Sequence, residues 1–324
     1  KPFDRAADLV KDGGTIYMTE GATIADSQIW ILINKPNVVV KRAPGMNDRM
    51  IYVNSSGDLT INTVTLDGGA VWEGEIDPVL GRGTTNNGIV PTSTDAQIIY
   101  VYEGNINMGN VTVQNNNPRL VEVHRAVTST FKNVTFKNGN NSGVSIDGTA
   151  DFIKCQIYGN YSSSNGGGVY ISNGDQDTVQ FIDCEIKSNK AGSYGGGIYT
   201  VSGYANIENS IISGNAAAIA GLGICLNTTQ ATIDQSTIAD NIQVDSGGVS
   251  DIYISNSTRD TYLKNSNIRY LAGTYNVYLN GTVTIKSLFF DSGSKAFLQD
   301  GFVGFKEDGT GSDIKINTDV GVTT

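Results

Sequence analysis

The sequence predicts an all-β protein: a right-handed parallel β-helix, or solenoid, of about 10–11 coils with a short N-terminal capping helix. The first observation behind this prediction is a strand–bend–strand pattern that recurs in nine copies. The second is a further short apolar run, such as "VYI" or "IYT", in front of each copy. The third is the composition, with 39% hydrophobic and 17% charged residues, which is too apolar for a disordered chain.

Each copy has two apolar residues in alternation, a step over two residues, and two more apolar or small residues in alternation. The second apolar position is occupied by Ile61, Met108, Phe131, Phe152, Phe181, Ile207, Ile233, Leu263 and Ile285. Alternation buries one face of a strand, and the two-residue step predicts a bend. Since one unit cannot bury its own apolar face, neighbouring units must stack, about 4.8 Å apart. Right-handed winding follows from the chirality of parallel crossovers.

The short run before each copy predicts a further strand, so that each coil has three. By alternation, its middle residue faces outward. These middle residues are Tyr52, Tyr100, Glu122, Ser145, Tyr170, Tyr199, Cys225, Tyr253 and Tyr278. We expect the tyrosines, in particular Tyr170, Tyr199, Tyr253 and Tyr278, to bind ligand by stacking on sugar faces. The alternative is structural, because tyrosine favours strands and pairs with itself across them.

Glycine and asparagine mark the corners between coils. The triplets at residues 166–168 and 195–197 lack the lysine of a phosphate loop and the aspartate of a calcium-binding nonapeptide. We therefore predict corners at which the side chains of stacked coils would collide. The regularly placed Asn160, Asn189, Asn215 and Asn241 predict a ladder of stacked amides.

Three segments are expected along the chain. Residues 1–14 form the capping helix, and two glycines end it. Residues 15–305 form a single parallel β-helix domain with a long loop insertion at 67–97, which contains Trp72. Insertions on solenoids often form the binding face. Residues 306–324 are a C-terminal cap or a linker.

A basic cluster lies one coil after the insertion. It consists of Arg119, His124, Arg125 and Lys132. In an acidic chain, such a cluster beside Trp72 predicts a site for a carboxylated sugar. The alternative is charge balance on an ordinary surface.

The cysteines and the histidine argue against catalysis and metal binding. The chain has no CxxC motif, and His124 is its only histidine, so a zinc site or a histidine-dependent triad is not expected. Cys155 and Cys184 share a core position in adjacent coils, where either a disulfide or two buried thiols would fit. Cys225 falls in the outward row. No catalytic residue, metal ligand or cofactor is assigned, and nothing in the sequence supports calcium.

The charge limits the classes of partner. A net charge of −10 disfavours nucleic acid and anionic membranes. No stretch reaches the roughly 18 apolar residues that cross a membrane, so this segment is not expected to insert. We expect a monomer whose partners are polysaccharides or glycoprotein glycans.

The corner motifs carry a resemblance to known families. "IYGN…GGGVYI" (157–171) and "IKSN…GGGIYT" (186–200) resemble the paired FxxN and GGA[ILV] repeats of polymorphic outer-membrane proteins, with Ile for Phe and Gly for Ala. With "GGTIYMTEGATI" at 13–24, the layout looks like the pectate-lyase-like adhesive domains of bacterial cell-surface adhesins. The resemblance implies an extracellular fragment of a larger anchored protein. It also implies non-catalytic binding of host or plant glycans, such as mucin or pectin-like polysaccharide, along a lateral face.

Two alternatives stay open. Families of this fold include enzymes, so the chain could be a polysaccharide lyase or a glycoside hydrolase that acts on polyuronates. Asp175 and Asp177 offer acidic groups for this chemistry, but no arginine partner accompanies them. The further alternative is a structural spacer that presents another domain.

Overall fold

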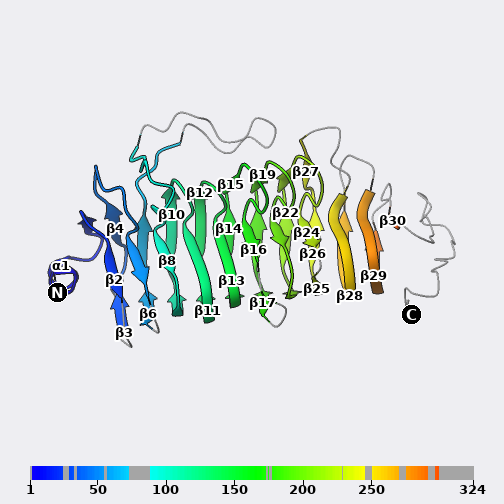
Figure 1. The fold of residues 1–324 in the computed structure, drawn as a ribbon, viewed down its shortest axis with the longest axis horizontal. Coiled ribbons are helices and arrows are strands. Elements are labelled where there is room, and N and C mark those ends of the chain that lie inside the picture. Colours follow the sequence, from blue (N-terminus) through cyan, green and yellow to red (C-terminus); the bar gives the residue numbers. More distant parts are fainter. Residues whose placement is uncertain are drawn as a thin grey trace.

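The computed structural model is an all-β parallel solenoid with almost no helix, which confirms the predicted fold class (Figure 1). It describes residues 2–24, 29–32, 35–54, 57–72, 88–172, 174, 177–227, 229–244, 250–269, 275–290 and 296–298. The strands follow one another along the long axis of the molecule, and every pairing between them is parallel. Each coil passes through three long rows of strands, here called A, B and C, and part of the stack has a fourth, short row D.

Row A begins with β1 (Thr15–Met18), β4 (Val38–Arg42), β7 (Val64–Asp67), β10 (Thr112–Asn116), β12 (Thr135–Gly139), β14 (Gln156–Tyr158), β18 (Glu185–Lys187), β22 (Ile211–Ser213) and β26 (Thr237–Ala239). Row B contains β2 (Ala22–Ile24), β5 (Ile51–Val53), β8 (Ile99–Val101), the first parts of β11 (Val121–Lys132) and β13 (Val144–Ile153), β16 (Val169–Ile171), β20 (Ile198–Thr200) and β24 (Ile224–Asn227).

Row C contains β3 (Ile29–Leu32), β6 (Gly57–Asn62), β9 (Gly104–Gly109), the last parts of β11 and β13, β17 (Thr178–Ile182), β21 (Tyr204–Glu208) and β25 (Gln230–Asp234). Row D contains β15 (Tyr161–Ser162), β19 (Lys190–Ala191), β23 (Ala216–Ala217) and β27 (Ile242–Gln243). The long β28 (Ser250–Arg269) and β29 (Tyr275–Phe290) continue rows A, B and C, and β30 (Ala296–Leu298) continues row B.

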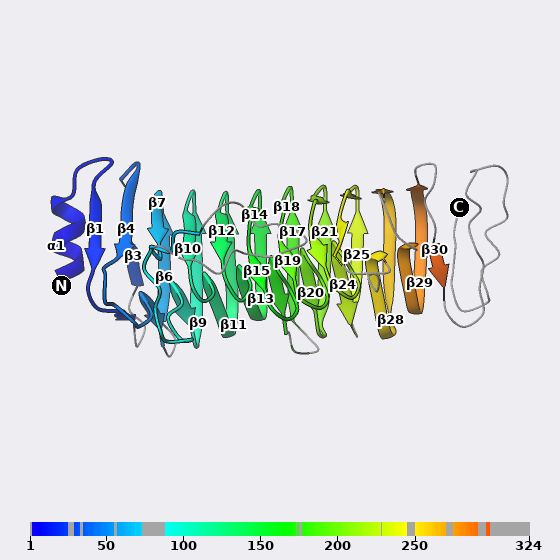
Figure 2. The same cartoon turned by 90° about the horizontal axis from the view of Figure 1, so that it is seen from above.

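The helix α1 (Pro2–Leu9) covers the N-terminal end of the stack, as Figure 2 shows. Ala6, Ala7 and Val10 pack against the core, whereas Leu9 is 72% exposed. The Lys35 Nζ atom donates to the backbone oxygens of Ala7, Asp8 and Val10 at 2.8, 2.9 and 3.0 Å. These bonds satisfy carbonyls that the end of a helix leaves without partners.

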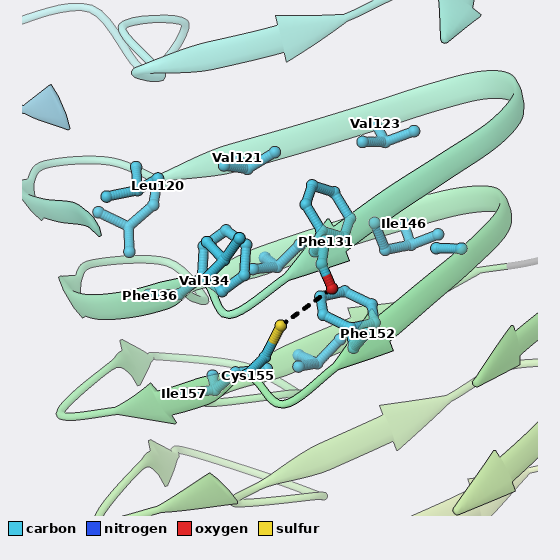
Figure 3. Close-up of a cluster of buried hydrophobic side chains, with 14 of the residues drawn as sticks. Leu120, Val121, Val123, Phe131, Val134, Phe136, Ile146, Phe152, Cys155 and Ile157 are labelled. Carbon is cyan, nitrogen blue, oxygen red and sulfur yellow. Dashed lines mark hydrogen bonds between the residues drawn. The ribbon is translucent and has the colours of Figure 1, made fainter. Parts of the chain in front are cut away.

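The core runs along the inside of the coils as stacked like residues. Phe131, Phe152 and Phe181 come from adjacent coils of row C, with ring centroids 4.8 and 4.9 Å apart. Phe136 meets Phe131 edge to face at 5.4 Å (Figure 3). These positions confirm that the alternating apolar residues of the repeat face inward.

The predicted bend lies between rows C and A and repeats in seven successive coils of the described chain, from β6–β7 to β25–β26. One residue of the bend has a left-handed backbone with φ of +47° to +56°. These residues are Thr63, Asn110, Asn133, Lys154, Asp183, Asn209 and Gln235. After such a residue, the following side chain points to the opposite face of the strand. The alternation therefore restarts, and the buried residues before and after the bend are three positions apart.

Cys155 and Cys184 sit just after this bend as free, buried thiols. The Cys155 Sγ atom donates to the Phe131 oxygen at 3.2 Å (Figure 3), and the Cys184 Sγ atom donates to the Phe152 oxygen at 3.3 Å. Burial raises the pKa of the Cys155 thiol, which keeps it protonated for this role. In the next coils, Ser210 and Ser236 take over the position and accept backbone N–H bonds from the preceding coil.

The asparagine ladder is confirmed at the corner after row A. The Asn160 Nδ2 atom donates to Asn189 Oδ1 at 3.0 Å, Asn189 to Asn215 at 3.0 Å, and Asn215 to Asn241 at 3.1 Å. All four side chains are buried. Each amide therefore satisfies its neighbour along the solenoid axis, as buried polar groups require.

Candidate functional site

The outward side of row B, here called the outer B face, carries most of the predicted binding residues. Its central column follows the strand register from Tyr52 through Tyr100, Glu122, Ser145, Tyr170, Tyr199 and Cys225 to Tyr253 and Tyr278. In β5, β8, β16 and β20 the middle tyrosine is half-buried between two buried residues, so it faces outward as predicted. The side chain of Tyr278 lies outside the described residues.

Tyr170 and Tyr199 form one pair of stacked rings on this face. Their centroids are 5.5 Å apart and their planes differ by 19°. Burial raises the pKa of Tyr199, Cys225 reinforces the shift, and a hydrogen bond to Asn227 opposes it. Tyr253 lies further along the column, and its ring centroid is 5.9 Å from that of Tyr194.

Cys225 corrects one prediction, because it occupies an outward position of the register and is nevertheless only 1% exposed. The corner before β24 folds back over it: a Cβ atom on Gly221 would lie 2.8 Å from the Cys225 Cβ atom. Burial raises the pKa of this thiol, so it stays protonated. Gly195 makes the same approach to Tyr199, at 2.7 Å from its Cβ atom, but the longer tyrosine side chain extends beyond the corner.

Tyr52 and Tyr100 form a second pair nearer the N-terminus. Their ring centroids are 5.6 Å apart with the planes tilted by 44°. The guanidinium carbon of Arg49 lies 4.1 Å from the Tyr100 centroid and 5.4 Å from that of Tyr52, a cation–π arrangement. Burial raises the pKa of Tyr100, the Glu122 carboxylate reinforces this shift, and Arg49 opposes it. Sequence reasoning missed Arg49, which lies in a loop without a repeat signal.

Glu122 follows Tyr100 in the column and is held from two sides. The Gln97 Nε2 atom donates to Glu122 Oε2 at 2.8 Å, and the Arg119 Nη1 atom lies 3.1 Å from the same oxygen. The Arg49 Nε atom donates to Gln97 Oε1 at 3.2 Å, so the network extends back to the tyrosine pair. Arg119 also donates to the Asn141 oxygen at 2.8 Å. The two guanidinium groups and the carboxylate are thereby fixed relative to the column.

His124 lies two residues after Glu122, on the same face. Its Nδ1 atom is 3.3 Å from Asp147 Oδ2 in the next coil, and its ring centroid is 5.7 Å from that of Tyr102 in the preceding coil. Both His124 and Asp147 are partly exposed. Glu122, His124 and Asp147 form a partly exposed polar segment between the two tyrosine pairs, whereas Ser145, in the same column, is buried at 7% exposure.

A buried arginine supports the loops that carry Arg49 and Gln97. Arg42 is fully buried, and its guanidinium donates to the backbone oxygens of Met46, Asp48, Ala96 and Gln97. Burial lowers the pKa of Arg42 to about 10, which still leaves it charged at neutral pH. The cation therefore ties residues 46–48 to residues 96–97, at the C-terminal end of the insertion.

The structure separates the members of the predicted basic cluster. Arg119 and His124 are on the outer B face, whereas Lys132 is exposed at the end of the row C part of β11. The side chain of Arg125 lies outside the described residues. Trp72 is half-buried at the base of the insertion, and residues 73–87 lie outside the described part of the chain.

Two further findings concern metals and membranes. Among the described residues, no three His, Cys, Asp or Glu side chains are grouped in a way that could hold a metal ion. Within the same part of the chain, no helix has the length and apolar character needed to span a membrane.

Comparisons with known proteins add little to this site. No family model matches the chain, and no curated protein matches it. Among solved structures, it is similar to one described as "Crystal structure of pectate lyase Pel9A". The TM-score is 0.44 and the identity 16%, over 79% of this chain and 69% of that one.

Proposed function

We propose that this chain binds carbohydrate along the outer B face and does not cleave it. The observation that carries the proposal is the presence of two tyrosine pairs, Tyr52 with Tyr100 and Tyr170 with Tyr199, in one outward column. Half-exposed aromatic rings offer an apolar surface to the C–H face of a sugar, while the phenol hydroxyl stays available for hydrogen bonds.

The polar segment supplies the groups that hydroxyl-rich ligands need. Glu122 and Asp147 offer carboxylate acceptors, and the amide of Gln97 and the imidazole of His124 lie beside them. Their mutual bonds hold these groups in place before a ligand arrives, which reduces the entropy lost on binding.

An extracellular location is consistent with carbohydrate binding. The net charge of −10 favours a soluble, non-sticky surface, and the repeats resemble those of bacterial surface proteins. We therefore place the chain on the bacterial cell surface, as a fragment of a larger anchored adhesin whose ligand is a host or plant glycan.

The test is binding to immobilised glycans, including mucin and pectin, with tyrosine variants. The double variant Tyr170→Ser/Tyr199→Ser should weaken binding by about tenfold or more, since each ring contributes on the order of 1 kcal/mol. The matched control is Tyr158→Ser. Tyr158 is half-buried on the outer side of row A, and its ring centroid lies 6.0 Å from the Nζ atoms of Lys137 and Lys187. Equal losses in the two variants, or no glycan binding by the unaltered chain, would contradict the proposal.

A further inference from the structure

Building on the proposed function, we infer that the ligand is an uncharged, linear polysaccharide that runs parallel to the solenoid axis and bridges both tyrosine pairs. The spacing of the two tyrosine pairs and the charges between them support this ligand.

The spacing follows from the register. Tyr52, Tyr100, Glu122, Ser145, Tyr170 and Tyr199 occupy successive positions of one column, so five strand spacings separate the first from the last. At about 4.8 Å per spacing, the column from Tyr52 to Tyr199 is roughly 24 Å long, and the gap from Tyr100 to Tyr170 is roughly 14 Å. A disaccharide can therefore contact one pair only.

The direction of the ligand follows from the same geometry. The coils stack in register, so the aromatic column runs along the solenoid axis and not along the strands. An extended chain of 1,4-linked pyranoses advances by about one coil spacing per sugar, so successive sugars meet successive coils. A chain of five or six sugars spans both pairs and passes over Glu122 and the buried Ser145 between them.

The charges on this face argue against a polyuronate. Arg119 lies 3.1 Å from Glu122, and Arg49 lies 3.7 Å from Asp95. With Asp147, which lies 3.3 Å from the His124 Nδ1 atom, three carboxylates face two guanidinium groups and one imidazole among these residues. A polyanion would have to displace an acidic partner in a chain whose net charge is already −10. Neutral hydroxyls can instead donate to Glu122 and Asp147 without disturbing the ion pairs.

This ligand class differs from the carboxylated sugar expected from the basic cluster. That expectation required free cations, whereas Arg119 is paired and Lys132 lies in another row. Contact with two tyrosine pairs through one chain makes the second contact intramolecular, so affinity should increase steeply once the chain is long enough to reach.

The experiment is calorimetric titration of the full chain with oligosaccharides of two to eight sugars. Neutral β-1,4-linked gluco-, manno-, galacto- and xylo-oligosaccharides form one arm, and oligogalacturonates of the same lengths form the other. In the neutral series that binds, affinity should increase at least about tenfold between three and six sugars. The oligogalacturonates should bind more weakly at every length.

Variants separate bridging from simple stacking. Tyr170→Ser/Tyr199→Ser should abolish the increase with length but leave trisaccharide binding at Tyr52 and Tyr100, whereas Tyr158→Ser should preserve the increase. Trisaccharides that bind as tightly as hexasaccharides would overturn bridging and leave glycan binding intact. Tighter binding of oligogalacturonates would overturn the assignment of an uncharged ligand. Failure of every glycan to bind would overturn the proposed function as well.

Discussion

A Cβ atom on Gly168 would lie 3.0 Å from the Nδ2 atom of Asn189 in the next coil. Gly197 has the same relation to Asn215, at 3.2 Å, and Gly223 to Asn241, at 2.9 Å. The last glycine of each of these corners, which are two triplets and the Gly-Leu-Gly at 221–223, thus leaves room for the buried amide of the following coil. The glycine corners and the asparagine ladder are two parts of one packing arrangement.

This relation predicts that Gly168→Ala destabilises the solenoid. The added methyl group would lie 2.6 Å from the Gly197 backbone oxygen and 3.0 Å from the Asn189 amide, which hydrogen bonds fix on both sides. We therefore expect a loss of about 1–3 kcal/mol in unfolding free energy. Denaturant unfolding would measure it. The control is Gly174→Ala, since Gly174 is exposed and, among the described residues, its Cβ atom would meet the Asp177 carboxylate alone, at 3.1 Å. Equal stability of the two variants would contradict the packing argument.

Removal of one amide should weaken the ladder in both directions. The Asn189 Nδ2 atom donates to Asn215 and to the Ile157 oxygen at 2.8 Å, and its Oδ1 atom accepts from Asn160. Asn189→Ala leaves these buried partners unsatisfied, at a cost of about 2–4 kcal/mol. Hydrogen exchange should increase in the adjoining coils, because each coil contacts only its neighbours. The half-buried Asn206 on row C provides the control variant Asn206→Ala, in which exchange should stay nearly unchanged.

The repeat made the coils, bends and ladder predictable, because strand alternation and corner residues act over short distances. Arg49 and Lys35 were not predictable, since their partners depend on which loops the coils bring together. Cys225 shows a different limit: alternation gives the direction of a side chain but not what covers it. The members of the basic cluster lie apart because the chain turns a corner between His124 and Lys132. This corner places Lys132 in row C, and the short sequence separation of the two residues does not reveal it.

Replacement of Arg42 should lower both the unfolding free energy and the glycan affinity, although Arg42 is fully buried and cannot contact a ligand. Arg42→Met removes the donors to four backbone oxygens, so we expect a loss of about 3 kcal/mol. Glycan affinity should also fall, because the loops that carry Arg49 and Gln97 lose their common support. Lys41→Met in the same strand is the control, since Lys41 is half-exposed and should change stability by less than about 0.5 kcal/mol. Unchanged unfolding of the Arg42 variant would refute this role.

Asp251 should make stability depend on pH. It is fully buried in β28, and burial raises its pKa well above the usual value; Asn241 opposes this shift and Asp240 reinforces it. The native state thus disfavours the carboxylate, so stability falls as pH increases from about 4, where the unfolded side chain ionises, toward the raised native pKa.

Asp251→Asn removes that charge. We expect the variant to be more stable than the unaltered chain at pH 7, by about 1–3 kcal/mol, and the difference to shrink toward zero below about pH 4. Thermal unfolding across this pH range would measure it, with Asp234→Asn as the control because Asp234 is half-exposed in β25. A difference that stays constant with pH would mean that the effect comes from packing, since only an ionising group at Asp251 can make it vary.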